Sequence, residues 1–147
     1  DEVAYHRTMS YAAVDGLVRE EDAHFALPLV GREVDQLCFD YAVTLVVEGT
    51  DTIRLESVFT VQLSGGTHVI DPARLETAAV LLELHRAVVT RAEAGKDGSL
   101  VLEFDDGRWL RAEPEPDGEA WEVLGGLPPI SPPYRVACAA GGGLRFE

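Results

Sequence analysis

Apolar and polar residues alternate along most of the chain from residue 33 onward, a pattern typical of antiparallel strands with one buried face. Asp106 and Gly107 separate two of the alternating runs, and because both positions tolerate positive φ, the pair predicts a hairpin turn. The pattern predicts strands over 33–39, 41–48, 52–63, 87–94, 99–104, 108–113, 119–124, 134–139 and 144–146, and a short pairing at 69–70. We therefore expect a mainly β (α+β) fold.

Two segments have helical spacing instead. Apolar residues near the N-terminus predict a helical leader over residues 1–25, ahead of a β-rich domain over 26–147. Asp71-Pro72 predicts the start of a connecting helix that runs to His85, because Asp accepts hydrogen bonds from first-turn amides and Pro needs no donor there. The stripe expected to lie across the sheet consists of Leu75, Ala78, Ala79, Leu82 and Leu81.

One β pattern occurs twice. Leu29–Val34 aligns with Glu83–Val88, and Val43–Arg54 aligns with Leu100–Arg111. The repeat therefore predicts two related antiparallel β units, over 29–63 and 83–124, that form packed sheets or a partly open barrel. The apolar spacing recurs but the reactive residues do not, so the repeat indicates shared architecture rather than a duplicated catalytic site.

The composition favours a single acidic domain. The chain has 147 residues, of which 46% are hydrophobic, and 26 Asp and Glu oppose 12 Lys and Arg, giving a formal net charge of -14. A strongly negative protein repels nucleic acid and anionic membranes, so the favoured partner is a basic protein, although the same charge also serves solubility alone. Without an apolar run of about 20 residues or a signal-like N-terminus, a cytoplasmic location is expected.

The residues most often used in catalysis or metal binding are not grouped in any known spacing. Asp105-Asp106 is expected to form a turn, since no EF-hand-like loop surrounds it. Cys38 and Cys138 are expected to be buried free thiols, with a disulfide as the alternative in an exported protein. The scattered histidines, His6, His24, His68 and His85, have no zinc-site spacing. The sequence therefore predicts no cofactor, no metal and no catalytic residue, and an enzyme is not the favoured interpretation.

Trp109 and Trp121 both lie in predicted strands, where core packing is the simpler interpretation. The alternative is that one of them is an exposed anchor ringed by carboxylates, as in interface hot spots. Our first hypothesis is accordingly a non-enzymatic protein-binding module whose acidic loops engage a basic partner. The candidate partner-binding residues are Asp105, Asp106, Glu113, Glu115, Asp117, Glu119 and Trp121.

Two other classes of function stay open at this point. A small enzyme or small-ligand-binding β domain would place its site between the two β units, where Tyr41, His68 and His85 would converge. An accessory subunit of a larger assembly would use the helical leader and the proline-rich connector over 127–133 to pack on a neighbouring chain.

Four segments carry a resemblance to a known kind of protein. They are Leu29–Cys38, Asp97–Leu110, Glu119–Val123 and the glycine run Gly141–Gly143, and together they cover the chain from about residue 29 to the C-terminus. Their order resembles a family of small, uncharacterised actinobacterial domains with no assigned activity. In size, acidity and closing pattern, the chain is also similar to immunity partners of secreted bacterial toxins, which implies a role as an inhibitor of a basic partner.

Overall fold

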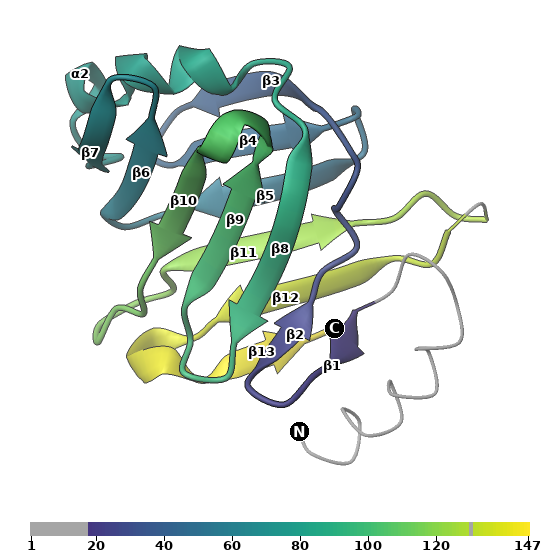
Figure 1. Cartoon of the computed structure of the whole chain (residues 1–147). Helices are drawn as coiled ribbons and strands as arrows, with labels where there is room; N and C mark the ends of the chain where they lie inside the picture. Colours follow the sequence, from purple (N-terminus) through teal and green to yellow (C-terminus); the bar gives the residue numbers. More distant parts are fainter. Residues whose placement is uncertain (1–17, 130) are drawn as a thin grey trace.

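The computed structural model describes residues 18–129 and 131–147, which form a sandwich of two packed antiparallel sheets (Figure 1). The predicted mainly β fold is thus confirmed. The seven-stranded sheet has the order β1 (Arg19–Glu20), β2 (His24–Ala26), β8 (Val89–Gly95), β9 (Leu100–Phe104), β10 (Trp109–Ala112), β6 (Phe59–Leu63) and β7 (Gly66–Ile70). The six-stranded sheet has the order β13 (Leu144–Phe146), β12 (Tyr134–Cys138), β11 (Trp121–Gly125), β5 (Asp51–Leu55), β4 (Val43–Val47) and β3 (Val34–Phe39).

The two copies of the repeated pattern occupy equivalent places in the two sheets. Strands β3, β4 and β5 form a meander in one sheet, and β8, β9 and β10 form the same meander in the other, each with an irregular register at the start of its first strand. After each meander the chain crosses over, so β6 pairs with β10 and β11 pairs with β5. An isolated bridge between Glu33 and Val88 joins the residues that come directly before β3 and β8. Each unit therefore completes the sheet of the other.

The core lies between the sheets and follows the alternation in the sequence. In β4, β5, β6 and β9 every second residue is buried and the residues between them are partly exposed. Phe25 and Phe146 close one side of the sandwich through an edge-to-face contact with ring centroids 4.8 Å apart. Burying each large aliphatic or aromatic side chain contributes about 1.5–3 kcal/mol. Apolar packing between the two sheets is therefore the main source of stability.

The connecting helix differs from its prediction in start, type and buried face. Asp71 Oδ1 accepts a hydrogen bond from the Ala73 amide, but α2 (Leu75–Ala78) begins later and continues as the 3-10 helix η2 (Ala79–Leu84). A 3-10 helix has three residues per turn, so the buried residues are three apart: Ala78, Leu81 and Leu84. Leu75 and Leu82, predicted to be buried, are 61% and 63% exposed.

Two further predictions were wrong in detail. The leader helix was predicted to reach residue 25, but Arg19–Glu20 and His24–Ala26 are paired strands; the rest of it, residues 1–17, lies outside the described residues. The single strand predicted over 52–63 is two strands, β5 and β6, because the chain changes sheets at residues 56–58. No helix in the described part of the chain is both long and apolar enough to cross a membrane.

Candidate functional site

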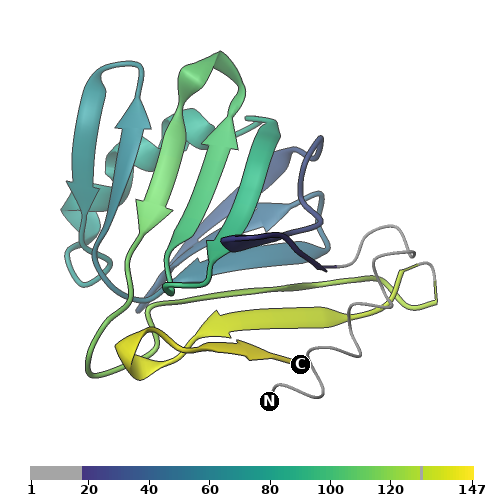
Figure 2. The same cartoon turned by 60° about the horizontal axis from the view of Figure 1, so that its bottom comes forward.

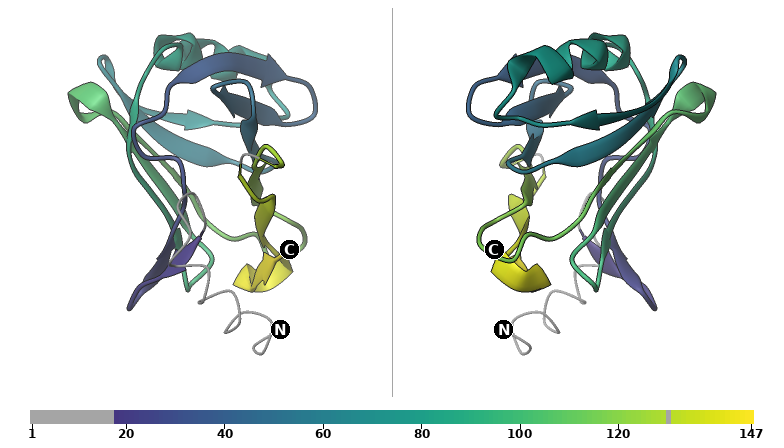
Figure 3. Two further views of the ribbon diagram at one scale, coloured as in Figure 1. Left: turned by 90° about the vertical axis from the view of Figure 1, so that its right-hand side faces the viewer. Right: turned by 90° about the vertical axis from the view of Figure 1, so that its left-hand side faces the viewer.

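The seven-stranded sheet has an outer face that points away from the other sheet. Because the neighbouring residues Leu110 and Ala112 point into the core, Trp109 and Arg111 of β10 point outward. The same alternation in β6, β8 and β9 gives an outer face that consists of Thr60, Gln62, Arg91, Glu93, Val101, Glu103, Trp109 and Arg111. The views in Figures 1 and 3 show that the other sheet packs on the opposite side and that none of the described elements covers this outer face.

Trp109 is the aromatic side chain of the outer face. It is partly exposed and is paired in register with Glu103 of β9 and Gln62 of β6. Trp121, by contrast, is fully buried, and its Nε1 donates a hydrogen bond of 2.9 Å to the carbonyl of Gly98. Trp121 therefore belongs to the core, and its predicted role in contacting a partner is wrong; Trp109 is the tryptophan placed to be a surface anchor.

The predicted acidic residues lie at the two ends of β10 rather than in one patch. Asp105 and Asp106 form the turn before it, where Asp105 accepts a hydrogen bond of 2.8 Å from Arg108 and the Asp106 side chain is 86% exposed. Asp106 and Gly107 have φ values of 64° and 76°, which confirms the predicted hairpin turn. The other predicted acids follow β10, in the crossover loop of residues 113–119.

In the crossover loop the acidic side chains differ in their partners. Glu113 forms an ion pair with Arg111 of the outer face. Glu119 forms ion pairs with Arg135 and Arg145, so its charge is neutralised within the molecule. Glu115 and Asp117 have no basic partner among the described residues.

Three more acidic residues join this loop at the same end of the sandwich, and the sequence pattern did not indicate them. The Lys96 amide donates to the Ala23 carbonyl, which brings the β1–β2 turn with Glu21 and Asp22 beside the β8–β9 turn with Asp97. The Gly141 amide donates to the carbonyl of Glu115, so the turn at η4 (Ala140–Gly142) also lies against the crossover loop (Figure 2). We call this group, Glu21, Asp22, Asp97, Glu113, Glu115 and Asp117, the acidic end.

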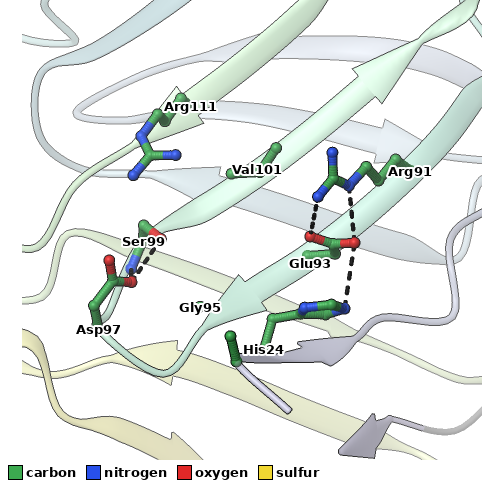
Figure 4. A pocket seen from close by; sticks show the side chains of 9 residues that line it. His24, Arg91, Glu93, Gly95, Asp97, Ser99, Val101 and Arg111 are labelled. Carbon is green, nitrogen blue, oxygen red and sulfur yellow. Dashed lines mark hydrogen bonds and ion pairs between the residues drawn. The ribbon is translucent and has the colours of Figure 1, made fainter. Parts of the chain in front are cut away.

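A depression of about 410 Å³ lies where the outer face meets the acidic end (Figure 4). Ala23, Gly95 and Val101 contribute small or apolar surface to it. One wall carries Arg91, Glu93 and His24, and the other carries Asp97, Ser99 and Arg111. Arg91 binds Glu93 through two hydrogen bonds of 2.8 and 2.9 Å and also reaches Glu103 at 3.0 Å. These hydrogen bonds raise the pKa of Arg91 and lower that of Glu93, so both groups are charged.

A buried polar network lies apart from the outer face, at the start of β5. The Asp51 carboxylate accepts hydrogen bonds from Thr50, from Tyr134 at 2.7 Å and from Arg32 at 3.2 Å. Burial opposes ionisation of Asp51, but the hydrogen bonds from Arg32, Tyr134 and Thr50 outweigh it and hold its pKa below the ordinary value. Every carboxylate oxygen of Asp51 has a donor, so the network is a structural cross-link between β5, β12 and the segment before β3.

The residues of the ligand-binding alternative do not converge. Tyr41 lies at the β3–β4 turn and is 90% exposed, His68 lies in β7 of the other sheet, and His85 is exposed after η2. Apolar side chains fill the space between the two β units, where that site was expected. Among the described residues no group of three or more His, Cys, Asp or Glu side chains is arranged to hold a metal ion.

The prediction that both cysteines are buried is correct for Cys138 and wrong for Cys38. Cys138 is buried, and burial raises the pKa of its thiol. Cys38 is exposed because its position in β3 points away from the core. Both are free thiols.

Comparison with known proteins identifies the domain without naming an activity. A search of curated proteins and a search of solved structures found no match. One family model matches residues 25–146, which is nearly the whole sandwich, and it is described as a family of unknown function, DUF6188. The chain therefore belongs to the DUF6188 family.

Proposed function

We propose that the protein is a non-enzymatic binding module that recognises a basic protein partner through the outer face of the seven-stranded sheet. The observation that carries the proposal is the position of Trp109, between two acidic groups on a sheet face that none of the described elements covers. Large aromatic side chains near the centre of an interface supply much of its binding energy, while surrounding charges guide the approach of the partner.

The charges around the outer face support a basic partner. In the described part of the chain every basic side chain from Arg32 onward takes part in an ion pair with a carboxylate. The chain has more than twice as many acidic as basic residues, so carboxylates such as Glu115 and Asp117 are left to interact with another molecule. An immunity-type inhibitor that covers a basic toxin is the specific form of this function that we propose.

Affinity capture tests the proposal. The tagged protein is incubated with a native lysate at low and at moderate salt, beside a double variant, Glu115→Gln with Asp117→Asn, that removes the unpaired charges of the crossover loop. The control is Asp40→Asn with Glu76→Gln, which makes the same change of charge on exposed positions away from the outer face.

We expect one basic protein to be recovered stoichiometrically by the wild type and the control, and in clearly smaller amounts by the crossover-loop variant and at moderate salt. Equal recovery by both double variants, or capture of only acidic proteins, would contradict the proposal.

A further inference from the structure

We infer that the depression between the outer face and the acidic end receives a lysine or arginine side chain of the partner. The inference rests on the proposed function, but it concerns a chemical group that can be tested without the partner. It follows from the shape of the depression, from an unused acceptor on Asp97 and from the balance of charge around it.

Asp97 is held in place with one oxygen unused. Its Oδ1 accepts hydrogen bonds from the amide and from the hydroxyl of Ser99, at 3.0 and 2.7 Å. Ser99 is only 5% exposed, so this support comes from inside the fold. Oδ2 receives no hydrogen bond from another described residue, which leaves an acceptor on the wall of the depression (Figure 4). The hydrogen bonds from Ser99, together with a smaller contribution from the charge of Arg111, lower the pKa of Asp97, so this acceptor is charged.

The lack of a side chain at residue 95 allows this arrangement. A Cβ added to Gly95 would lie 2.5 Å from both Asp97 Oδ1 and Ser99 Oγ. Contacts that short would displace the Asp97–Ser99 pair from its present position. Glycine in β8 therefore keeps both the hydrogen bonds of Asp97 and the open space beside them.

The charged groups in and around the depression favour a cation over an anion. Both guanidinium groups are already paired, Arg91 with Glu93 and Glu103, and Arg111 with Glu113. His24 lies 3.3 Å from Glu93. Two carboxylates, Glu93 and Asp97, line the depression together with the two guanidinium groups. Glu103 and Glu113 lie just outside it as ion-pair partners of those guanidinium groups, and Glu21 and Asp22 add further negative charge at the neighbouring turn. An incoming carboxylate would be repelled, whereas an ammonium or guanidinium group would be attracted.

A long basic side chain also fits the apolar part of the depression. Lysine and arginine carry their charge at the end of an aliphatic stem, and such stems pack on apolar surface while the charged head stays hydrated. Val101 and Ala23 provide this surface, and Asp97 Oδ2 is available to accept from the head group. A hydrogen bond between two charged groups is about twice as strong as a neutral one.

NMR titration of the whole protein with a single amino-acid probe tests the inference directly. The probe is Nα-acetyl-L-arginine amide, and the matched control is the citrulline analogue, which has the same shape without the charge. We expect the arginine probe to shift the amide signals of Asp97, Ser99 and Val101 in a saturable way, and the citrulline probe to bind about tenfold more weakly or not at all.

Two variants separate a contact with Asp97 from general attraction by the acidic end. Asp97→Asn keeps the oxygen that accepts from Ser99 and removes the free one, so it should fold normally and weaken arginine binding by about tenfold. Asp22→Asn removes the same charge at the neighbouring turn and should weaken binding by less than about twofold.

Equal effects of the two variants, equal binding of both probes, or tighter binding of Nα-acetyl-L-glutamate amide would overturn the inference. If a basic partner is captured but Asp97→Asn binds it normally, the binding function stands and the inference fails. If the arginine probe binds as expected but no partner is captured, the inference about the depression stands and the proposed binding function fails.

Discussion

The Asp51 carboxylate accepts hydrogen bonds from three side chains: Arg32, Thr50 and Tyr134. Tyr134 donates to it across the six-stranded sheet, at a separation of 83 residues in sequence. Burial and the nearby Asp51 charge raise the pKa of Tyr134, so the tyrosine is a neutral donor at all ordinary pH values. Asp51 lies just outside the strand predicted over 52–63, and only the pairing of β5 with β11 and of β11 with β12 brings it close to Tyr134.

Tyr134→Phe should lower the free energy of unfolding by about 2 kcal/mol at pH 7, because it removes a hydrogen bond to a buried charged group. The pKa of Asp51 is lowered in the folded state, so its stabilising contribution is full above the ordinary Asp value of about 3.9 and is lost as the pH falls through the lowered value. Urea unfolding at several pH values should therefore show the effect of Tyr134→Phe shrinking below about pH 4. Tyr41→Phe, at an exposed turn, is the control and should change stability by less than about 0.5 kcal/mol.

The two tryptophans differ in their access to solvent, which fluorescence quenching measures. Trp121→Phe leaves only the partly exposed Trp109, and Trp109→Phe leaves only the fully buried Trp121. Neutral acrylamide should quench the emission of Trp121→Phe several times more efficiently than that of Trp109→Phe. Similar quenching of the two variants would show that Trp109 is not at the surface.

At the scale of elements, the connecting helix shows where the sequence pattern reaches its limit. Apolar residues over 75–84 fit an α-helical stripe and a 3-10 stripe almost equally well, and the two place different leucines in the core. Contact with the sheets decides between them, because Leu81 and Leu84 then fill the core while Leu75 and Leu82 face solvent. The hairpins were predictable because alternation and the Asp-Gly turn depend only on residues close in sequence.

Substitution of the adjacent leucines distinguishes the two helix types. Leu81→Ala should lower the free energy of unfolding by about 2–5 kcal/mol, because the side chain is fully buried. Leu82→Ala, at a position that is 63% exposed, should change it by less than about 0.5 kcal/mol. Thermal or denaturant unfolding gives both values. An effect of Leu82→Ala as large as that of Leu81→Ala, or larger, would support the α-helical stripe predicted from the sequence, which contains both leucines.

At the scale of the whole molecule, the crossing of the chain between sheets determines the candidate site. The repeat predicted two related β units, but it did not show that each unit gives its next hairpin to the sheet of the other. This exchange puts β10 between β9 and β6, in the middle of the outer face, with acidic groups at both ends. Glu21, Asp22 and Asp97 could not be assigned to the site from the sequence, since turns far apart in the chain bring them together.

Electrostatic steering predicts how a basic partner associates with this surface. The association rate, measured by stopped-flow or surface plasmon resonance with the captured partner, should fall at least about tenfold between low and moderate salt, because salt screens attraction at a distance. The dissociation rate should change much less, since it depends on the contacts made within the interface. An association rate that is independent of salt would rule out steering by the acidic groups.

The affinity of the captured partner for Trp109→Ala, measured by isothermal titration calorimetry, tests the central claim most directly. The matched control is Leu124→Ala, which removes a partly exposed apolar side chain from the outer side of the six-stranded sheet. If the outer face of the seven-stranded sheet is the interface, Trp109→Ala should raise Kd about thirtyfold or more, as for other interface hot spots, and Leu124→Ala should leave it unchanged. An unchanged Kd for Trp109→Ala in a normally folded variant would contradict the claim.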